Sequence, residues 1–421
     1  MRISTLHLYN LANNSMADAN SAINKTQEQL STGKRVLSAA DDPVAATKIQ
    51  QLTDNLALVD QYSKNISTAE NNLAEEETAL KSVTNLVQRI KELAVQAGNT
   101  ASLSTSEYSA LSTEVDSRLN ELVGLTNTRN ANGDYIFAGY KSQSPAFLGD
   151  SVSGYQYMGD EGALNIKIDD NTFVKASDSG KGIFVDIPNA EKTIITSVNP
   201  NNRSAPPITV SIGNIVDQQA YDDFYPEDMV ITFNDDSNLT PAARNFTVTE
   251  KSTGKVIAEN QPYAAGEALE FNGTSITITG NPASADTGLG LAGDQIFVDS
   301  TAKQDVLTTL MRFRDAMQGF DGSSEARERV SSTVAVTLDN LSTVQDSISN
   351  TVTEIGARMN TLDSTRDQHL DTELVSNTIL ADIRDLDYAE AASRLSAQTL
   401  ILQATQATFL RISELNLFSR L

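Results

Sequence analysis

The residue types that most often carry enzyme chemistry are scarce in this chain. Cysteine is absent, which removes thiolate nucleophiles, disulfides and zinc sites of the cysteine type. The two histidines, His7 and His369, lie in helical sequence and form no H-E-x-x-H arrangement, and no histidine is near the middle of the chain to serve a Ser/His/Asp site. We therefore interpret both histidines as helix-surface side chains and expect no catalytic residue, no metal site and no cofactor.

Other patterns resemble ligand-binding motifs but lack the required context. Residues 288–293 read G-x-G-x-x-G, yet a polar loop precedes them and residues 295–298 follow as a strand, whereas a dinucleotide site needs a strand before and a helix after. Residues 169–171 and 235–238 are acidic but lack the D-x-[DN]-x-[DN]-G spacing of a calcium loop. We interpret the first as a flexible loop and the other two as solvated turns.

One acidic pair keeps an enzymatic or glycan-binding alternative open. Asp222 and Asp223 are adjacent in the middle of the chain, and a glycosidase needs two carboxylates facing each other across a cleft. The sequence does not give that separation. A cleft with two facing carboxylates, one of them with a raised pKa, would support this alternative.

The composition excludes several further classes of function. The chain has 421 residues and a net charge of −24, which argues against binding nucleic acid or an anionic membrane surface. No apolar run approaches the ~18 residues of a membrane helix, and the first residues lack the apolar segment of a cleaved secretory signal. Aromatic residues make up only 6% of the chain, which favours long helices over an enzyme core around a pocket.

Apolar residues recur every seven positions at both ends of the chain. This spacing keeps one face of a helix turned toward a partner helix, as in a left-handed coiled coil. We expect helices over residues 8–32 (or from residue 4) and from about 371 to 417, neither of which can bury its stripe alone. The repeated positions are Tyr9, Met16, Ile23 and Leu30, and then Leu374, Ala381, Tyr388, Leu395, Leu402 and Phe409.

Longer periodic segments lie inside these ends. Asp42 and Pro43 predict a helix start, Gly98 predicts its end, and Leu73 belongs to the heptad that runs between them. Glu76 interrupts the companion stripe of this helix. Further helices are expected from residue 104 or 105 to about 125, over 306–320, and over 334–362, where Ile348 lies on the apolar stripe.

The centre of the chain is β-rich. Short alternating segments separated by turn residues favour a sandwich or a barrel-like domain. The Asn132-Gly133 turn should introduce the first strand. Strands are predicted over residues 135–139, 163–168, 182–187, 194–198, 208–212, 229–233, 246–249, 255–259, 269–271 and 275–279.

Together these patterns predict an α+β fold. Both chain ends form a discontinuous long-helix coiled-coil bundle, and a β-rich domain is inserted centrally. Residues 1–40 and 380–421 would make a terminal coiled-coil assembly layer, residues 41–140 and 301–379 an inner helical bundle, and residues 141–300 the inserted outer domain.

Several local motifs occur in an order that resembles the flagellin superfamily. They are Leu30-Ser-Thr-Gly-Lys-Arg-Val36, Ala40-Asp-Asp-Pro-Val-Ala-Ala46, Asn132-Gly-Asp-Tyr-Ile-Phe-Ala-Gly-Tyr140, Gly356-Ala-Arg-Met-Asn360 and Asp385-Leu-Asp-Tyr-Ala-Glu390. The resemblance covers roughly residues 1–140 and 300–421. Pro43 and residues 137–140 are similar to the hook–filament junction proteins of this superfamily rather than to filament flagellins.

The resemblance implies a structural adaptor of the bacterial flagellum that joins the hook, through another hook-associated protein, to the flagellin filament. It implies assembly with copies of itself, an export chaperone on the C-terminal helix, type III export without a cleaved signal, and an extracellular location. A minor filament flagellin is the nearest alternative. The expected assembly interface comprises Tyr9, Met16, Ile23, Leu30, Tyr388, Leu395, Leu402, Phe409, Leu417 and Phe418.

Overall fold

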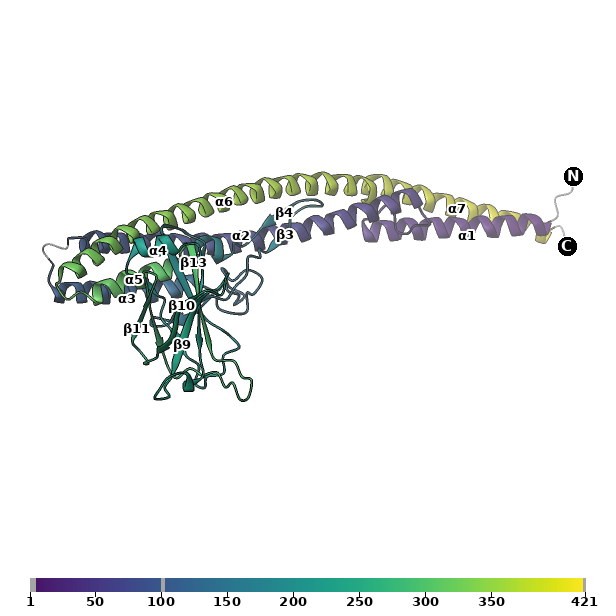
Figure 1. Cartoon of the computed structure of the whole chain (residues 1–421). Helices are drawn as coiled ribbons and strands as arrows, with labels where there is room; N and C mark the ends of the chain where they lie inside the picture. The colour runs from purple at the N-terminus through teal and green to yellow at the C-terminus, as the bar shows by residue number, and fades with distance from the viewer. Residues whose placement is uncertain (1–4, 100–102, 419–421) are drawn as a thin grey trace. The chain divides into compact units, whose positions relative to one another are not determined.

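A computed structural model describes residues 5–99 and 103–418 of the chain (Figure 1). It confirms a mixed helix and sheet fold with long helices toward both ends and a β-rich centre. The α-helices are α1 (Thr5–Thr32), α2 (Pro43–Ala97), α3 (Thr105–Thr126), α4 (Gln218–Phe224), α5 (Val306–Gln318), α6 (Ser324–Arg384) and α7 (Tyr388–Phe418). The π-helical turn η1 (Lys181–Val185) and the 3₁₀ turn η2 (Asp236–Asn238) are shorter.

Side-chain caps fix the starts of these helices where the sequence predicts them. The Ala45 amide donates to Asp42 Oδ1 at 3.0 Å, so Asp42 caps α2 and Pro43 occupies its first turn. Ser104 and Glu107 form a reciprocal capping box at α3. Each cap satisfies amides that have no partner inside the helix.

The strands are all antiparallel to their neighbours. A five-stranded sheet has the order β10-β9-β8-β13-β5, and a second sheet has the order β11-β12-β6 with β7 also paired to β12. Side chains from both sheets share one hydrophobic core, as expected for a sandwich. The bounds are β1 (Phe147–Asp150), β2 (Gly154–Tyr157), β3 (Asn165–Lys167), β4 (Phe173–Lys175), β5 (Pro188–Val198), β6 (Thr209–Val210), β7 (Asn214–Ile215), β8 (Met229–Phe233), β9 (Asn245–Glu250), β10 (Val256–Pro262), β11 (Ala268–Phe271), β12 (Thr274–Thr279) and β13 (Gln295–Lys303).

The chain divides into two compact units. The first comprises Met1–Ile66, Ile168–Asn171 and Asp363–Leu421, and the second comprises Ser67–Lys167 and Thr172–Leu362. The first unit therefore contains α1, α7, the start of α2 and the end of α6. The second contains the remaining helices and the sheets, with α3 packed on α5. This division into two units does not test the predicted domain boundaries, which remain a prediction.

Two predicted strands are wrong for the same physical reason. Residues 135–139 form turns, with a single bridge from Tyr135 to Arg129, and residues 182–187 largely form η1. In each segment two consecutive apolar side chains are buried, namely Phe137 with Ala138 and Ile183 with Phe184. A strand would turn such neighbours to opposite faces. Both segments instead wrap around one core, where the Phe137 and Phe184 rings meet edge to face at 5.1 Å.

The predicted start of the last helix near residue 371 is also wrong. The α6 helix continues to Arg384, and α7 begins only at Tyr388. Asp387 caps α7, because its Oδ1 accepts from the Ala389 amide at 2.8 Å and the Glu390 amide at 3.1 Å. The heptad passes through this break without interruption, so the periodicity conceals it.

The heptad positions of α2 and α6 are buried as predicted. Leu73 and Ile348 are almost fully inaccessible to solvent. Truncating either to alanine is expected to lower the free energy of unfolding by about 2–5 kcal/mol, because it removes buried methyl groups and leaves a cavity. Chemical denaturation of the purified chain measures this.

The matched control for these truncations is Val95→Ala, since Val95 lies on α2 but is 65% exposed. Equal stability of the Leu73 and Val95 variants would contradict the assignment of the helix faces.

Candidate assembly interface

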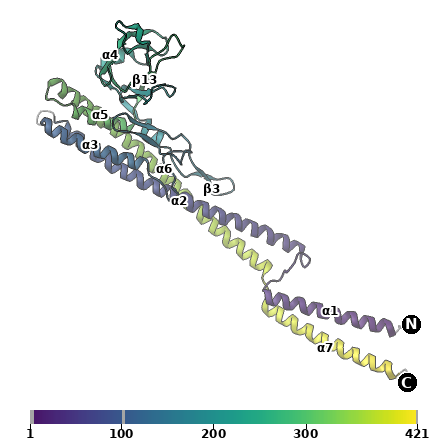
Figure 2. The ribbon, with the colours of Figure 1, turned by 90° about the horizontal axis from the view of Figure 1, so that it is seen from below.

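The terminal helices α1 and α7 lie side by side and antiparallel (Figures 1 and 2). The Thr26 hydroxyl donates to Gln398 Oε1 at 2.9 Å, and the Arg394 guanidinium donates to Gln29 Oε1 at 3.1 Å. The residue numbers rise along one helix as they fall along the other, which fixes the antiparallel direction. These four side chains mark the seam along which the two helices face each other.

Most of the predicted interface residues lie along this seam within the chain. Ile23 and Leu30 flank Thr26 by about one helical turn, and Leu395 and Leu402 flank Gln398 in the same way. Ile23 is buried, while Met16, Leu30, Leu395, Leu402 and Phe409 are half-buried. The side chains of Tyr9, Leu417 and Phe418 lie outside the part of the chain that the structure describes. Whether the seam also contacts other subunits remains a prediction.

The outward face of α7 carries apolar side chains that the heptad did not select. Leu400, Ile401 and Leu410 are each about 60% exposed or more. Leu400 lies on the opposite side of the helix from Gln398 and Leu402, and Ile401 and Leu410 lie on its two flanks. All three belong to the surface of α7 that α1 leaves exposed, which we call the outward face. A helix that is apolar on two faces needs a second covering surface. Several exposed apolar side chains on one short stretch of helix are typical of an interaction site.

A second exposed apolar stripe runs along the end of α6. Leu370, Leu374, Val375 and Ile379 are exposed, Leu374 most of all at 68%. The spacing of four residues places Leu370 with Leu374, and Val375 with Ile379, in two neighbouring rows along the helix. Leu374 was in the predicted heptad, but the other three were missed because they do not share its seven-residue period.

Tyr388, another predicted interface residue, is 58% exposed and lies at the junction of α6 and α7. Its hydroxyl covers Gly33, where a Cβ atom would approach the phenol oxygen to 2.8 Å. Gly33 also has a φ of +68°, which L-residues with side chains rarely adopt. Both observations explain why glycine ends α1 at this position.

The connectors at the ends of α1 and α6 are bonded to each other. The Arg35 amide donates to the Arg384 carbonyl at 2.7 Å, and the Leu386 amide donates to the Gly33 carbonyl at 2.9 Å. The Arg35 guanidinium adds two hydrogen bonds to the Ile383 carbonyl, at 3.1 and 2.8 Å. We call these hydrogen bonds, made by residues 33–35 with residues 383–386, the connector clamp. It joins two segments about 350 residues apart in the sequence.

A buried charge cluster lies within the second unit. Arg358, from the Gly356–Asn360 motif, donates to Asp178 Oδ2 at 2.5 Å, and Lys175 also pairs with Asp178. Burial acts to raise the pKa of Asp178, but the hydrogen bonds from Arg358 and Lys175 outweigh it and lower that pKa. Sequence reasoning missed this pair because Asp178 lies 180 residues from its partner.

Glu76 belongs to the same cluster. It is 1% exposed, and neither carboxylate oxygen has a hydrogen-bond partner among the described residues. Burial, reinforced by the negative charge of Asp178, raises the pKa of Glu76 to about 9. The carboxyl group is therefore mostly neutral at pH 7, which explains how the helix seam tolerates it.

The interpretation of both histidines as surface residues is wrong for His369. Its side chain is buried, and Nε2 donates to the Ile168 carbonyl at 2.8 Å, since a carbonyl oxygen can only accept. The ring also stacks on Tyr62 at a centroid distance of 5.8 Å. Its role is packing within the first unit. His7 is exposed, as predicted.

The segments that resemble ligand-binding motifs lie in loops and turns. Residues 288–293 lie in a loop before β13, with no helix N-terminus to receive a phosphate. Asp235 accepts hydrogen bonds from Ser237 and Thr287, as a capped turn does. Within the described residues, no group of three or more His, Asp or Glu side chains is arranged to hold a metal ion.

The chain is similar to known flagellar proteins. Residues 3–142 match the model of the bacterial flagellin N-terminal helical region. Flagellar hook-associated protein 3 of Salmonella typhimurium is 32% identical over 223 residues, which cover 48% of this chain and 69% of that protein. The Escherichia coli protein of the same name is 32% identical over 184 residues, covering 44% and 57% respectively.

A solved structure agrees at the level of the fold. The crystal structure of hook-associated protein 3 from Legionella pneumophila has a TM-score of 0.52 and 23% identity, covering 80% of this chain and 98% of that one. The resemblance to the flagellin superfamily, expected from the sequence motifs, is confirmed by the match to the flagellin N-terminal helical region and by the hook-associated relatives. With more than two thirds of the Salmonella protein matched at 32% identity, the chain belongs to the flagellar hook-associated protein 3 family.

Proposed function

We propose that this chain is a structural subunit of the bacterial flagellum that joins the hook to the filament. The observation that carries the proposal is the match to flagellar hook-associated protein 3 over 69% of that protein. The paired terminal helices support it, because α7 exposes an apolar face that a partner must cover. The family membership gives the role, and the exposed face gives the means of assembly.

The assembly layer would consist of residues 1–40 and 380–421. Within it, α1 and α7 pair as a coiled coil, and the outward face of α7 contacts a neighbouring copy. Residues 41–140 and 301–379 form the inner helical bundle, and residues 141–300 form the outer domain. Support comes from the antiparallel α1–α7 seam and from the burial of the heptad positions in α2 and α6.

The partners follow from this position. They are further copies of the chain in a ring, another hook-associated protein on the hook side, filament flagellin on the other side, and an export chaperone on α7 before assembly. The chain would reach the flagellum through the flagellar export apparatus and act outside the cell. Among the described helices, none combines the length and apolarity of a membrane span.

The role we propose is not enzymatic. Curated relatives in this family carry the names of flagellar components. The acidic pair that suggested a glycosidase lies on the short helix α4, where both side chains are exposed. Asp222 faces Lys192 at 3.8 Å rather than a second carboxylate. Neither residue lines the pocket between α5, α6, β5 and β7, so a glycosidase has no support from this pair.

The position of the protein on isolated flagella tests the proposal. An epitope tag in the loop at residues 252–254, which is exposed between β9 and β10, should be labelled only at the hook boundary. Labelling along the shaft would identify a filament flagellin instead. A strain without the gene should make hooks and release flagellin into the medium. Attached filaments in that strain would contradict the junction role.

A further inference from the structure

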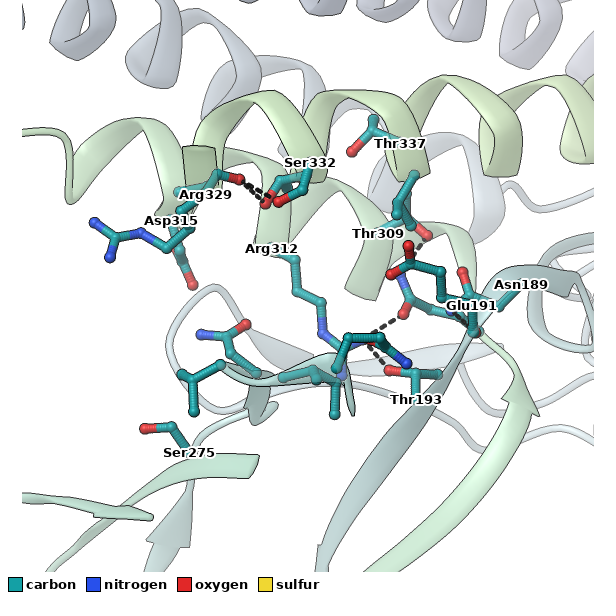
Figure 3. A pocket seen from close by; sticks show the side chains of 18 of the residues that line it. Asn189, Glu191, Thr193, Ser275, Thr309, Arg312, Asp315, Arg329, Ser332 and Thr337 are labelled. Atoms are coloured by element: carbon teal, nitrogen blue, oxygen red, sulfur yellow. Dashed lines mark hydrogen bonds between the residues drawn. The ribbon is translucent and has the colours of Figure 1, made fainter. Parts of the chain in front are cut away.

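A cavity of the second unit lies where the β-rich region meets the helices. It has a volume of about 480 Å³ and is bounded by α5 and α6 on one side and by β5 and β7 on the other (Figure 3). A single water needs only ~10–15 Å³ of such space, so the cavity can hold a small molecule. The junction role makes no use of it.

A guanidinium group extends from α5 into this cavity. Arg312 Nε donates to the Gly213 carbonyl at 3.1 Å, Nη2 donates to the Ile194 carbonyl at 3.0 Å, and Nη1 donates to Thr193 and Gln304. All four acceptors are neutral oxygens, and one N–H on Nη2 remains. No carboxylate of the described residues lies within 4.0 Å of Arg312, so its charge has no direct counter-ion.

The charge persists at neutral pH. Burial lowers the pKa of Arg312 to about 10, and the carboxyl group of Asp305 acts in the opposite direction. That carboxyl group is itself occupied as the N-cap of α5, accepting from the Thr308 amide at 2.7 Å. Removing a cation from water without a close counter-ion costs free energy, and a bound anion would offset this desolvation cost at Arg312.

Two more cations lie at the rim of the cavity. Arg329 is exposed and donates to the Gly319 carbonyl at 3.1 Å, and Lys192 is 3.8 Å from Asp222. Two carboxylates also line the rim, but Asp315 is paired with Arg314 at 2.7 Å, which leaves Glu191. Lys192 is likewise already paired with Asp222. Arg312 and Arg329 against Glu191 therefore leave one net positive charge, which favours a ligand with a single negative charge over a doubly charged phosphate.

The other residues that line the cavity restrict the chemical class of its ligand. Hydroxyl and amide side chains dominate this lining, and no aromatic ring lies among the described residues that form it. A nucleobase or other planar ligand would call for a stacking ring. Side chains that both donate and accept instead suit a ligand with several hydroxyl groups. Examples of this lining are Thr193, Asn214, Gln218, Ser275, Ser332 and Thr333.

We propose that this cavity binds a small polyhydroxylated carboxylate of the uronic-acid class. The carboxylate faces Arg312 and the rim cations, and the hydroxyl groups exchange hydrogen bonds with the threonine, serine and amide side chains. The site is independent of the junction role, because it lies in the second unit and uses no residue of the terminal helices.

Titration of the full chain with glucuronate tests the proposal, followed by calorimetry and by methyl NMR. The Ile215 and Val336 methyl groups line the cavity and should shift saturably, whereas Val248, buried in the sheet core, should not. Glucose is the uncharged matched ligand and should bind at least about tenfold more weakly. Inorganic phosphate tests whether the site binds any oxyanion or requires the hydroxyl groups of the ligand. It should also bind more weakly than glucuronate.

Rim variants separate binding from folding. Arg329→Gln and Lys192→Gln should each weaken glucuronate binding several-fold with unchanged thermal unfolding, since both side chains are on the surface. Lys255→Gln, at an exposed position elsewhere in the domain, is the matched control and should bind normally. Equal affinity for glucose, tighter binding of phosphate, or no shift at about 10 mM glucuronate would overturn the proposal. So would unchanged affinity in both rim variants.

Discussion

Replacing Glu76 with glutamine is expected to stabilise the folded chain by about 3 kcal/mol at pH 7. The carboxyl group has a pKa of about 9 in the fold, against an ordinary value of 4.5, so the folded state holds a proton that the unfolded state releases. Glutamine keeps the shape of the neutral acid and removes the cost of holding that proton. The estimate follows from about 1.4 kcal/mol per unit of pKa over the interval from 4.5 to 7.

The pH dependence of the free energy of unfolding tests the raised pKa of Glu76 more directly than the stability at a single pH. Between pH 4.5 and 9 the folded state binds one more proton at Glu76 than the unfolded state, so the free energy of unfolding falls as the pH rises. Asp178 acts in a different window: its lowered pKa contributes stability above pH 3.8 that is lost as the pH falls further. Arg358 and Lys175 also face Glu76, and their positive charges oppose the rise of its pKa.

Urea denaturation at a series of pH values, for the natural chain and Glu76→Gln, measures this difference. The curve of the variant should be flatter above pH 5, and the two should converge at lower pH. Glu77→Gln is the matched control, because Glu77 is the next residue on α2 and pairs with Lys81 at 2.7 Å on the surface. It should change stability by less than about 1 kcal/mol. A Glu76 variant less stable than the natural chain at pH 8 would refute the assignment of a neutral carboxyl group.

Placing aspartates at Leu400 and Ile401 is expected to abolish filament attachment while the purified chain stays folded. Both side chains are exposed on the outward face of α7, so the monomer loses little. In an assembly they would become buried, and an unpaired buried charge costs several kcal/mol in every copy. Repetition around a ring multiplies that cost, so the loss should be nearly complete. Electron microscopy of cells and flagellin in the culture medium report it.

Two comparisons make this result interpretable. Ser396→Asp with Gln403→Asp adds the same charge at exposed polar positions about one turn on either side of Leu400, on the same face of α7, and should also impair filament attachment. Leu402→Asp with Phe409→Asp changes the half-buried seam instead, and should expose α1 and α7 to rapid hydrogen exchange as well as block assembly. Export of each variant must be measured first, since the proposed chaperone binds the same helix. Attached filaments on cells that export the Leu400 and Ile401 variant would contradict the outward face as an interface.

Local signals in the sequence were sufficient to predict the long helices and their buried faces. Asp42 with Pro43 marks the start of α2, and the heptad through Leu73 marks its buried face. The break before α7 was missed because Leu374, Ala381 and Tyr388 keep the seven-residue period across it. The signal that would have located it is Asp387 followed by Glu390, a helix-capping pattern that competes with the period.

The burial of His369 and the two faces of α7 depend on contacts between segments that are distant in the sequence. His369 is buried because its partner, the Ile168 carbonyl, is supplied by a hairpin 201 residues earlier. The seam and the outward face of α7 could not be distinguished from periodicity, since Leu402 and Leu400 are both apolar and only the position of α1 separates them. No local pattern contains that information.

The connector clamp has a mechanical consequence. A single flexible linker between a terminal helix and the helix next to it would act as a swivel and would let a twist dissipate. Here Gly33 and Arg35 on one connector are hydrogen-bonded to Leu386 and Arg384 on the other. A torque on the α1–α7 pair therefore loads two strands of backbone at once and must break the hydrogen bonds between them before either connector can rotate alone. The clamp lets a subunit transmit rotation through two thin connectors.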